Sequence, residues 1–112
     1  MLIDQLSPQS NLFAGRDTQI IDMCNYLKEN CAEAYAIVLF GSYARGDNKL
    51  TSDLDILLLT KEEIGRYRRS DLVSYADLHD TDLIIYTLDK FRESECLLVN
   101  RIREEGLILW KA

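Results

Sequence analysis

Asp53 and Asp55 flank Leu54 at the start of the apolar run DLDILLLT. Side chains alternate across a β-strand, so both carboxylates point to one face, about 7 Å apart along the strand. Two like charges at this spacing repel each other unless a cation lies between them, and Mg²⁺ binds carboxylate oxygens. The pair therefore predicts a metal site. The alternative is that both aspartates lie at the solvated entrance of the strand and cap the preceding loop.

A turn upstream of this pair has the residues of an anion site. Gly41 and Ser42 follow the apolar run YAIVLF, where a strand is expected to end and a short helical segment to begin. Backbone N–H groups and the Ser42 hydroxyl can converge there on a phosphate, and a glycine allows a positive φ or close approach of the anion. Arg45 can reach the same anion, and Tyr43 can contact a nucleotide base. A plain strand-to-helix turn with a solvated arginine is the alternative.

A third carboxylate, Asp82, opens the run DLIIYT, and a strand there can bring it beside Asp53 and Asp55. Three carboxylates suit two metal ions, which can bind a triphosphate, activate an attacking hydroxyl and neutralise the leaving pyrophosphate. Asp80 shares the face of Asp82 if the strand begins two residues earlier, but Asp82 is preferred because it directly precedes the apolar run. His79, the only histidine, is a further proton acceptor, with a loop histidine as the simpler interpretation.

The elements that must position these residues are indicated by periodicity. Apolar residues at three- and four-residue steps predict helices over 17–29, 61–78 and 91–105. Apolar, β-rich runs predict strands over 35–40, 53–60, 81–87 and 107–110. Segment 41–52 has room for a short helical turn and a loop. This order predicts an α/β or α+β fold with a small mixed sheet flanked by helices, in which a crossover helix joins two strands.

Length and composition set the broad class. The 112 residues suit a single domain, 1–112, with residues 1–16 the loosest by composition. Nineteen acidic and 13 basic residues give a formal charge of −6, which opposes binding to long DNA or RNA. The apolar runs are far shorter than the roughly 20 residues that cross a bilayer. No export signal is recognisable, so a cytoplasmic location is expected.

Two further groups of residues are expected to be structural. Arg66, Arg68 and Arg69 could screen a triphosphate, but a solvated helix face is the preferred interpretation. The cysteines lack the spacing of a metal site or a disulfide framework and are expected to be buried thiols; they are Cys24, Cys31 and Cys96.

The motifs together resemble a known family. Gly41-Ser42, ten intervening residues and Asp53-Leu54-Asp55, in the stretch GSYARGDNKLTSDLDILLLT, resemble the signature of the nucleotidyltransferase superfamily related to DNA polymerase β. With TDLIIYT and the ending REEGLILW, the chain is similar over nearly its whole length to the minimal nucleotidyltransferases, or MNT proteins. The resemblance implies a polymerase β-like palm, Mg²⁺ and transfer of a nucleoside monophosphate from an NTP to an acceptor.

The resemblance also assigns roles by position. Gly41 and Ser42 would hold the β- and γ-phosphates, with Arg45 a further contact suggested by its spacing from Ser42. Asp53 and Asp55 would bind two Mg²⁺ ions. Asp82 would assist as a third ligand and as the base toward the acceptor hydroxyl. The chemistry is an in-line attack on the α-phosphate, which needs positioning and charge compensation rather than a nucleophilic side chain.

A partner is implied as well. MNT proteins pair with small HEPN-domain proteins, often ribonuclease toxins, and the resemblance implies an antitoxin that adenylylates a tyrosine of the toxin with ATP. A homodimer or a hetero-oligomer is expected, because little beyond the catalytic palm is present. Two alternatives stay open. The first is modification of a small molecule such as an aminoglycoside, and the second is a nucleotide-binding antitoxin that acts by contact alone.

Overall fold

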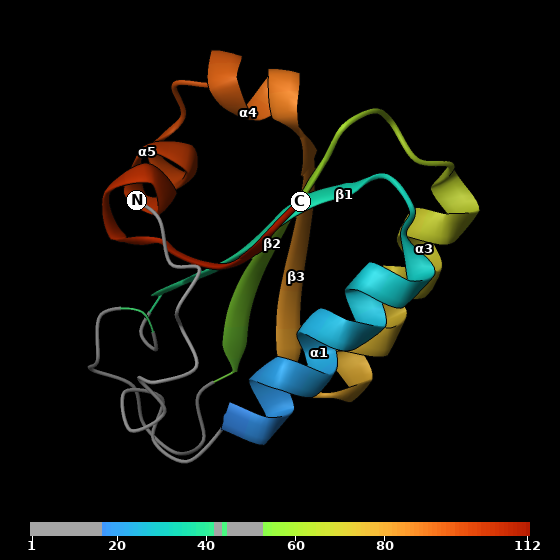
Figure 1. The fold of residues 1–112 in the computed structure, drawn as a ribbon. Coiled ribbons are helices and arrows are strands. Elements are labelled where there is room, and N and C mark those ends of the chain that lie inside the picture. The colour runs from blue at the N-terminus through green and yellow to red at the C-terminus, as the bar shows by residue number, and fades with distance from the viewer. Residues whose placement is uncertain (1–16, 42–43, 45–52) are drawn as a thin grey trace.

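The computed structural model describes residues 17–41, 44 and 53–112. Its sheet has the strand order β3-β2-β1-β4 (Figure 1). In chain order the described elements are α1 (Asp17–Asn30), β1 (Ala34–Phe40), β2 (Leu54–Thr60), α3 (Arg66–Leu78), β3 (Thr81–Thr87), α4 (Leu88–Glu93), α5 (Leu97–Glu105) and β4 (Leu107–Lys111). Strand β1 is antiparallel to both of its neighbours, whereas β2 and β3 are parallel. The predicted mixed sheet flanked by helices is therefore confirmed, with β4 as an edge strand.

The parallel pair depends on helix α3. Parallel neighbours need a crossover connection, and α3 returns the chain from the end of β2 to the start of β3. The register runs from Leu54 beside Thr81 to Thr60 beside Thr87. Both strands therefore begin at the same end of the sheet, and the polar residues at their starts lie close together.

Helices cover both faces of the sheet (Figure 1). Helices α1 and α3 pack on one face, where Leu27 and Leu72 belong to one hydrophobic cluster with alternate strand residues such as Ile56. Helix α5 packs on the other face, where Ile102 lies among residues such as Leu57. Strands β1 and β2 are buried at almost every position, which explains why their sequences are continuous apolar runs rather than alternating ones.

The predicted helix over 91–105 is wrong in one respect, because it is two helices. Thr87 caps α4 by accepting a hydrogen bond from the Lys90 N–H at 3.1 Å, and the helix ends at Glu93. The Arg103 guanidinium donates to the carbonyl of Phe91 at 2.6 Å and stacks 5.3 Å over the Phe91 ring. Arg103 thus satisfies a carbonyl near the end of α4 and holds the two helices together.

Two other expectations need correction. The helix predicted over 61–78 begins at Arg66, because Gly65 is its extended N-cap. Cys24 and Cys31 are buried free thiols as expected, but Cys96 is exposed at the N-cap of α5. Burial raises the pKa of Cys24 to about 12.

Other predictions concern parts of the chain that the structure describes only partly or not at all. The short helical turn expected within 41–52 lies outside the described residues apart from Gly41 and Ala44, as do residues 1–16. Among the residues that are described, no helix has the length and apolar character of a membrane span.

Candidate active site

Asp55 and Asp82 are direct neighbours on adjacent strands. They pair in the parallel register of β2 and β3, so their backbones lie about 4.8 Å apart and their side chains leave the same face of the sheet. Asp55 is half-buried and Asp82 is exposed. The burial of β3 alternates as expected, with Leu83 and Ile85 in the core and Asp82 on the opposite face. The structure thus brings together two carboxylates that are 27 positions apart in the sequence.

Gly41 lies against the carboxylate of Asp55. Its φ is +75°, a left-handed conformation that favours glycine. A Cβ on Gly41 would lie 2.2 Å from Oδ2 and 2.9 Å from Cγ of Asp55. Two independent constraints therefore require glycine here, the backbone angle and the adjacent carboxylate. The sequence indicated the first of these and a close approach of phosphate, but not the contact with Asp55.

Asp53 is exposed and lies immediately before β2, two residues from Asp55. Within residues 17–41, 44 and 53–112, no three side chains of His, Cys, Asp or Glu form a ready group for a metal ion. Asp53, Asp55 and Asp82 thus share one end of the sheet without forming a closed three-ligand cage. The donor set is entirely carboxylate oxygen, and Gly41 leaves one side of Asp55 without a side chain, which fits a hard cation such as Mg²⁺.

In the structure Asp80 lies before strand β3 and is not part of it. Asp80 has φ 55° and belongs to the turn between α3 and β3, where its carbonyl accepts a hydrogen bond from Leu54 N–H at 3.0 Å. Strand β3 begins only at Thr81. Asp80 therefore does not share the register of Asp82, which favours Asp82 as the third carboxylate.

His79 belongs to the layer of α1 and α3. Its ring stacks on Tyr75 with the centroids 4.1 Å apart, and its Nδ1 lies 2.8 Å from the Tyr75 carbonyl oxygen. Asp82 leaves the sheet on the other face, so the geometry does not favour His79 as a proton acceptor beside Asp82.

The three arginines lie at the opposite end of the parallel strands, where α3 begins. Arg68 forms an ion pair with Glu33 and lowers the pKa of that carboxyl group. Arg69 donates to the carbonyl of Ile85 at 3.1 Å. Arg66 stacks over Tyr67 at 5.7 Å. The contacts of Arg68 and Arg69 tie α3 to the rest of the fold, whereas Arg66 stacks on its neighbour in the same helix.

The remaining predicted contacts belong to the turn that follows β1. Ser42, Tyr43 and Arg45 lie outside the described residues. Of the predicted phosphate-binding turn, only Gly41 and Ala44 are described. The geometry of the site therefore rests on Gly41 and the three aspartates.

This fold and these residues define the class of the protein. The chain belongs to the nucleotidyltransferase domain family, whose model matches residues 23–109. The matched range contains Gly41, Asp53, Asp55 and Asp82, so all the described candidate residues lie in the family domain.

Individual relatives are consistent with this assignment. The chain is 30% identical over 87 residues to the protein adenylyltransferase MntA of Shewanella oneidensis, covering 75% of this chain and 59% of that protein. It is 41% identical over 54 residues to a Methanocaldococcus jannaschii protein provisionally named a protein adenylyltransferase, covering 48% of this chain and 55% of the relative. The chain thus matches less than two thirds of the length of either curated relative.

A solved structure extends the similarity to three dimensions. The structure described as a toxin-antitoxin with AMP-PNP matches with a TM-score of 0.60 and 27% identity. The match covers 85% of this chain and 73% of the solved chain. The sheet and its flanking helices therefore have the same overall arrangement as that solved chain.

Proposed function

We propose that this domain is a magnesium-dependent nucleotidyltransferase that transfers AMP from ATP to a tyrosine hydroxyl of a HEPN-domain toxin. It would act as the antitoxin of the pair, in the cytoplasm where ATP is supplied. The observation that carries the proposal is the pairing of Asp55 with Asp82 at one end of the sheet, with Gly41 against Asp55. Similarity to a protein adenylyltransferase and to a toxin-antitoxin structure with an ATP analogue supports the choice of donor and acceptor.

Each carboxylate has a distinct role in this proposal. Asp53, immediately before β2, and Asp55, two residues later, would hold the Mg²⁺ ions, while Asp82 would complete the ligand set. Mg²⁺ bound there would neutralise charge on the triphosphate and on the leaving pyrophosphate. Asp55 is half-buried beside Gly41, so its orientation is restricted, whereas the exposed Asp82 is accessible to an incoming acceptor.

The proposed transfer balances without a covalent enzyme intermediate. The tyrosine oxygen attacks the α-phosphorus, the bond from that phosphorus to the bridging oxygen of the β-phosphate breaks, and pyrophosphate leaves. The hydroxyl proton passes to a carboxylate oxygen of Asp82. Gly41 and Ser42 would contact the β- and γ-phosphates, with Arg45 adding positive charge.

Intact-mass measurement tests this proposal directly. The protein is incubated with α-labelled ATP, Mg²⁺ and a HEPN-domain protein encoded beside its own gene. We expect the toxin to gain the mass of at least one adenylyl group on a tyrosine. The double variant Asp53→Asn, Asp55→Asn is expected to abolish the gain, while Asp71→Asn, a change at an exposed position of α3, is expected to leave it unchanged.

Other results would contradict the proposal. Neutralisation of the toxin without a mass change, and to the same extent by the double variant, would indicate an antitoxin that acts by contact alone. Labelling of an aminoglycoside with no labelling of the toxin would indicate a small-molecule acceptor.

A further inference from the structure

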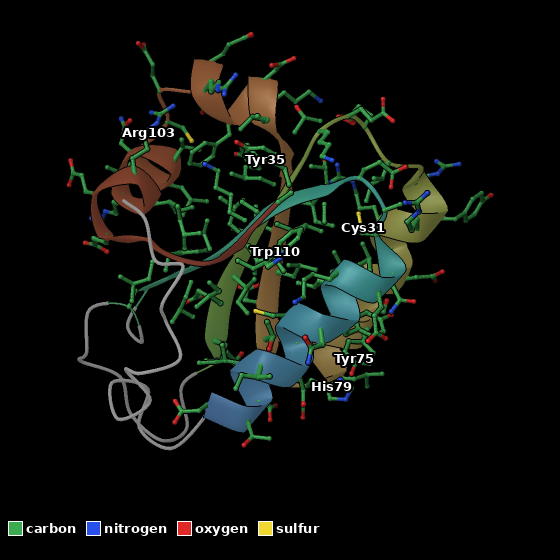
Figure 2. All side chains as sticks on the ribbon, in the orientation of Figure 1. Cys31, Tyr35, Tyr75, His79, Arg103 and Trp110 are labelled. Atoms are coloured by element: carbon green, nitrogen blue, oxygen red, sulfur yellow. The ribbon has the colours of Figure 1, made fainter. Side chains whose placement is uncertain are left out.

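A groove of about 320 Å³ lies between α1 and α3, in the helical layer on the opposite face of the sheet from Asp55 and Asp82. It is open to solvent and is lined by Thr18, Gln19, Asp22 and Met23 of α1 and by Tyr75 and His79. Figure 2 shows Tyr75 and His79 side by side at this end of the helices. The nucleotidyl-transfer site does not use these side chains, so the groove needs its own explanation.

A stack of three aromatic rings borders the groove. Tyr26 of α1 stacks on Tyr75 of α3, with centroids 3.5 Å apart and planes 4° from parallel. His79 continues the stack on Tyr75 and is exposed. Among the described residues, no other ring stacks on the second face of His79. The stack therefore ends in a flat surface that is open to a ligand.

Hydrogen bonds hold this last ring in place. Its Nδ1 lies 2.8 Å from the Tyr75 carbonyl oxygen, and the carbonyl of His79 accepts a hydrogen bond from the side chain of Gln19 at 2.7 Å. Both the ring and the backbone of His79 are thus fixed by the two helices that form the groove. A ligand that stacks on His79 would meet a preorganised surface, which reduces the entropy lost on binding.

The carboxylate that lines the groove is that of Asp22, an exposed residue, and no lysine or arginine is among the described lining residues. A planar cation would match both the exposed His79 ring and the Asp22 carboxylate, since a guanidinium stacks on an aromatic ring and donates paired hydrogen bonds to a carboxylate. A lysine ammonium offers the charge but not the flat face.

We propose that this groove docks an arginine side chain of the acceptor protein, with the guanidinium stacked on His79 and donating to Asp22. The site lies close to the reaction centre along the chain. Asp82 follows His79 by three residues, so their Cα atoms are at most about 11 Å apart. An acceptor anchored in the groove would have neighbouring segments within reach of Asp82. The role of the arginine in docking an acceptor rests on the proposed function, whereas arginine binding does not.

An NMR titration tests the binding step without any nucleotide. His79 is the only histidine, so its imidazole Cε1–H signal is assigned without ambiguity, and N-acetyl-arginine amide at pH 8 is the probe. We expect a saturable shift in the millimolar range, at least about tenfold weaker in Asp22→Asn because a charge-assisted hydrogen bond is lost. Asp71→Asn should bind normally, and N-acetyl-lysine amide should bind several-fold more weakly than the arginine probe.

Three results would overturn the assignment of the groove. The first is the lack of any shift of the His79 signal, and the second is equal affinity in the wild type and in Asp22→Asn. The third is tighter binding of AMP than of the arginine probe, because this would identify a site for a nucleobase.

A kinetic measurement separates the docking role from the proposed function. In the adenylylation reaction, Asp22→Lys is expected to raise the KM for the acceptor protein about tenfold with kcat and ATP affinity unchanged, while Asp71→Lys is expected to have no effect. An unchanged KM in an active enzyme would refute docking and leave the proposed function intact. Arginine binding by a protein that transfers no AMP would refute the proposed function and leave the groove assignment intact.

Discussion

Replacement of Gly41 by alanine tests whether this glycine positions the carboxylate of Asp55. The new Cβ would lie 2.2 Å from Oδ2, 2.9 Å from Cγ and 3.1 Å from Cβ of Asp55. Ordinary contacts of this kind begin at 3.4 Å, so the carboxylate oxygen has to move by about 1 Å to remove the overlap. The substitution therefore displaces a proposed metal ligand without removing it.

Gly41→Ala is expected to have two separate effects, one on the stability of the fold and one on the rate of AMP transfer. The φ of +75° at Gly41 is unfavourable for alanine by about 1–2 kcal/mol, because Cβ crowds the backbone in the left-handed region. The free energy of unfolding should fall by at least that amount. A displacement of about 1 Å at a catalytic group can slow the reaction by about 100-fold, so we expect AMP transfer to slow by this factor.

Urea unfolding and single-turnover transfer measure the two effects. Gly65→Ala is a matched control, because no atom lies within 4 Å of its added methyl group and its φ is −64°. We expect this control to transfer AMP at the wild-type rate. Normal stability and normal transfer in Gly41→Ala would refute the assignment.

A double-mutant cycle isolates the contact between the two residues. In an Asp55→Ala background the Oδ2 and Cγ atoms are gone, so Gly41→Ala should cost only the backbone part of its destabilisation and the remaining contact with Cβ of residue 55 at 3.1 Å. A smaller loss of stability in this background than in the wild type is the expected result. Equal losses in the two backgrounds would show that the carboxylate and the glycine do not interact.

Three further predictions concern other parts of the molecule. Asp82→Asn is expected to slow single-turnover transfer at least about 100-fold with little change in ATP affinity, since a proton acceptor is lost. Asp80→Asn is expected to transfer almost normally. The reverse pattern would identify Asp80 as the third carboxylate. Arg68 lowers the pKa of Glu33 from its usual 4.5 in the folded state, so the ion pair stabilises the fold at neutral pH and ceases to do so as the pH falls below this range. Urea midpoints of the wild type and Arg68→Gln should therefore differ at pH 7 and converge in acid, and a constant difference would refute this. The exposed Cys96 has a pKa lowered by hydrogen bonds from the Ser94 hydroxyl and a backbone N–H, so mass spectrometry should find it alkylated by iodoacetamide at pH 7.5 well before the two buried cysteines.

Strands were predictable because burial on both faces leaves a clear pattern. The run YAIVLF and the run DLDILLLT, which is apolar from Ile56 to Leu59, correspond to β1 and β2 within one residue at each end. Strand β3 was predicted with its observed bounds from the apolar, β-rich run DLIIYT, and in the structure its buried residues alternate with more exposed ones. The DxD spacing likewise indicated a shared face from strand geometry alone.

Contacts between distant residues were not predictable from local pattern. Periodicity over 91–105 is consistent with one helix, and the break arises from Thr87 capping α4 and Arg103 bonding to its last turn. The ion pair of Arg68 with Glu33 joins residues 35 positions apart. The contact of Gly41 with Asp55 also depends on how β1 and β2 pair, which no single segment encodes.

The lengths of α3 and β2 carry more information about the site than their periodicity. Helix α3 has 13 residues and is about 20 Å long, while β2 has seven residues and is about 23 Å long. Because the two lengths nearly match, the helix returns the chain to the level at which β2 began. Strand β3 then starts with Thr81 beside Leu54, and the next residue on each strand is an aspartate. The matching lengths of α3 and β2 therefore explain why Asp82, rather than Asp80 in the preceding turn, lies beside Asp55.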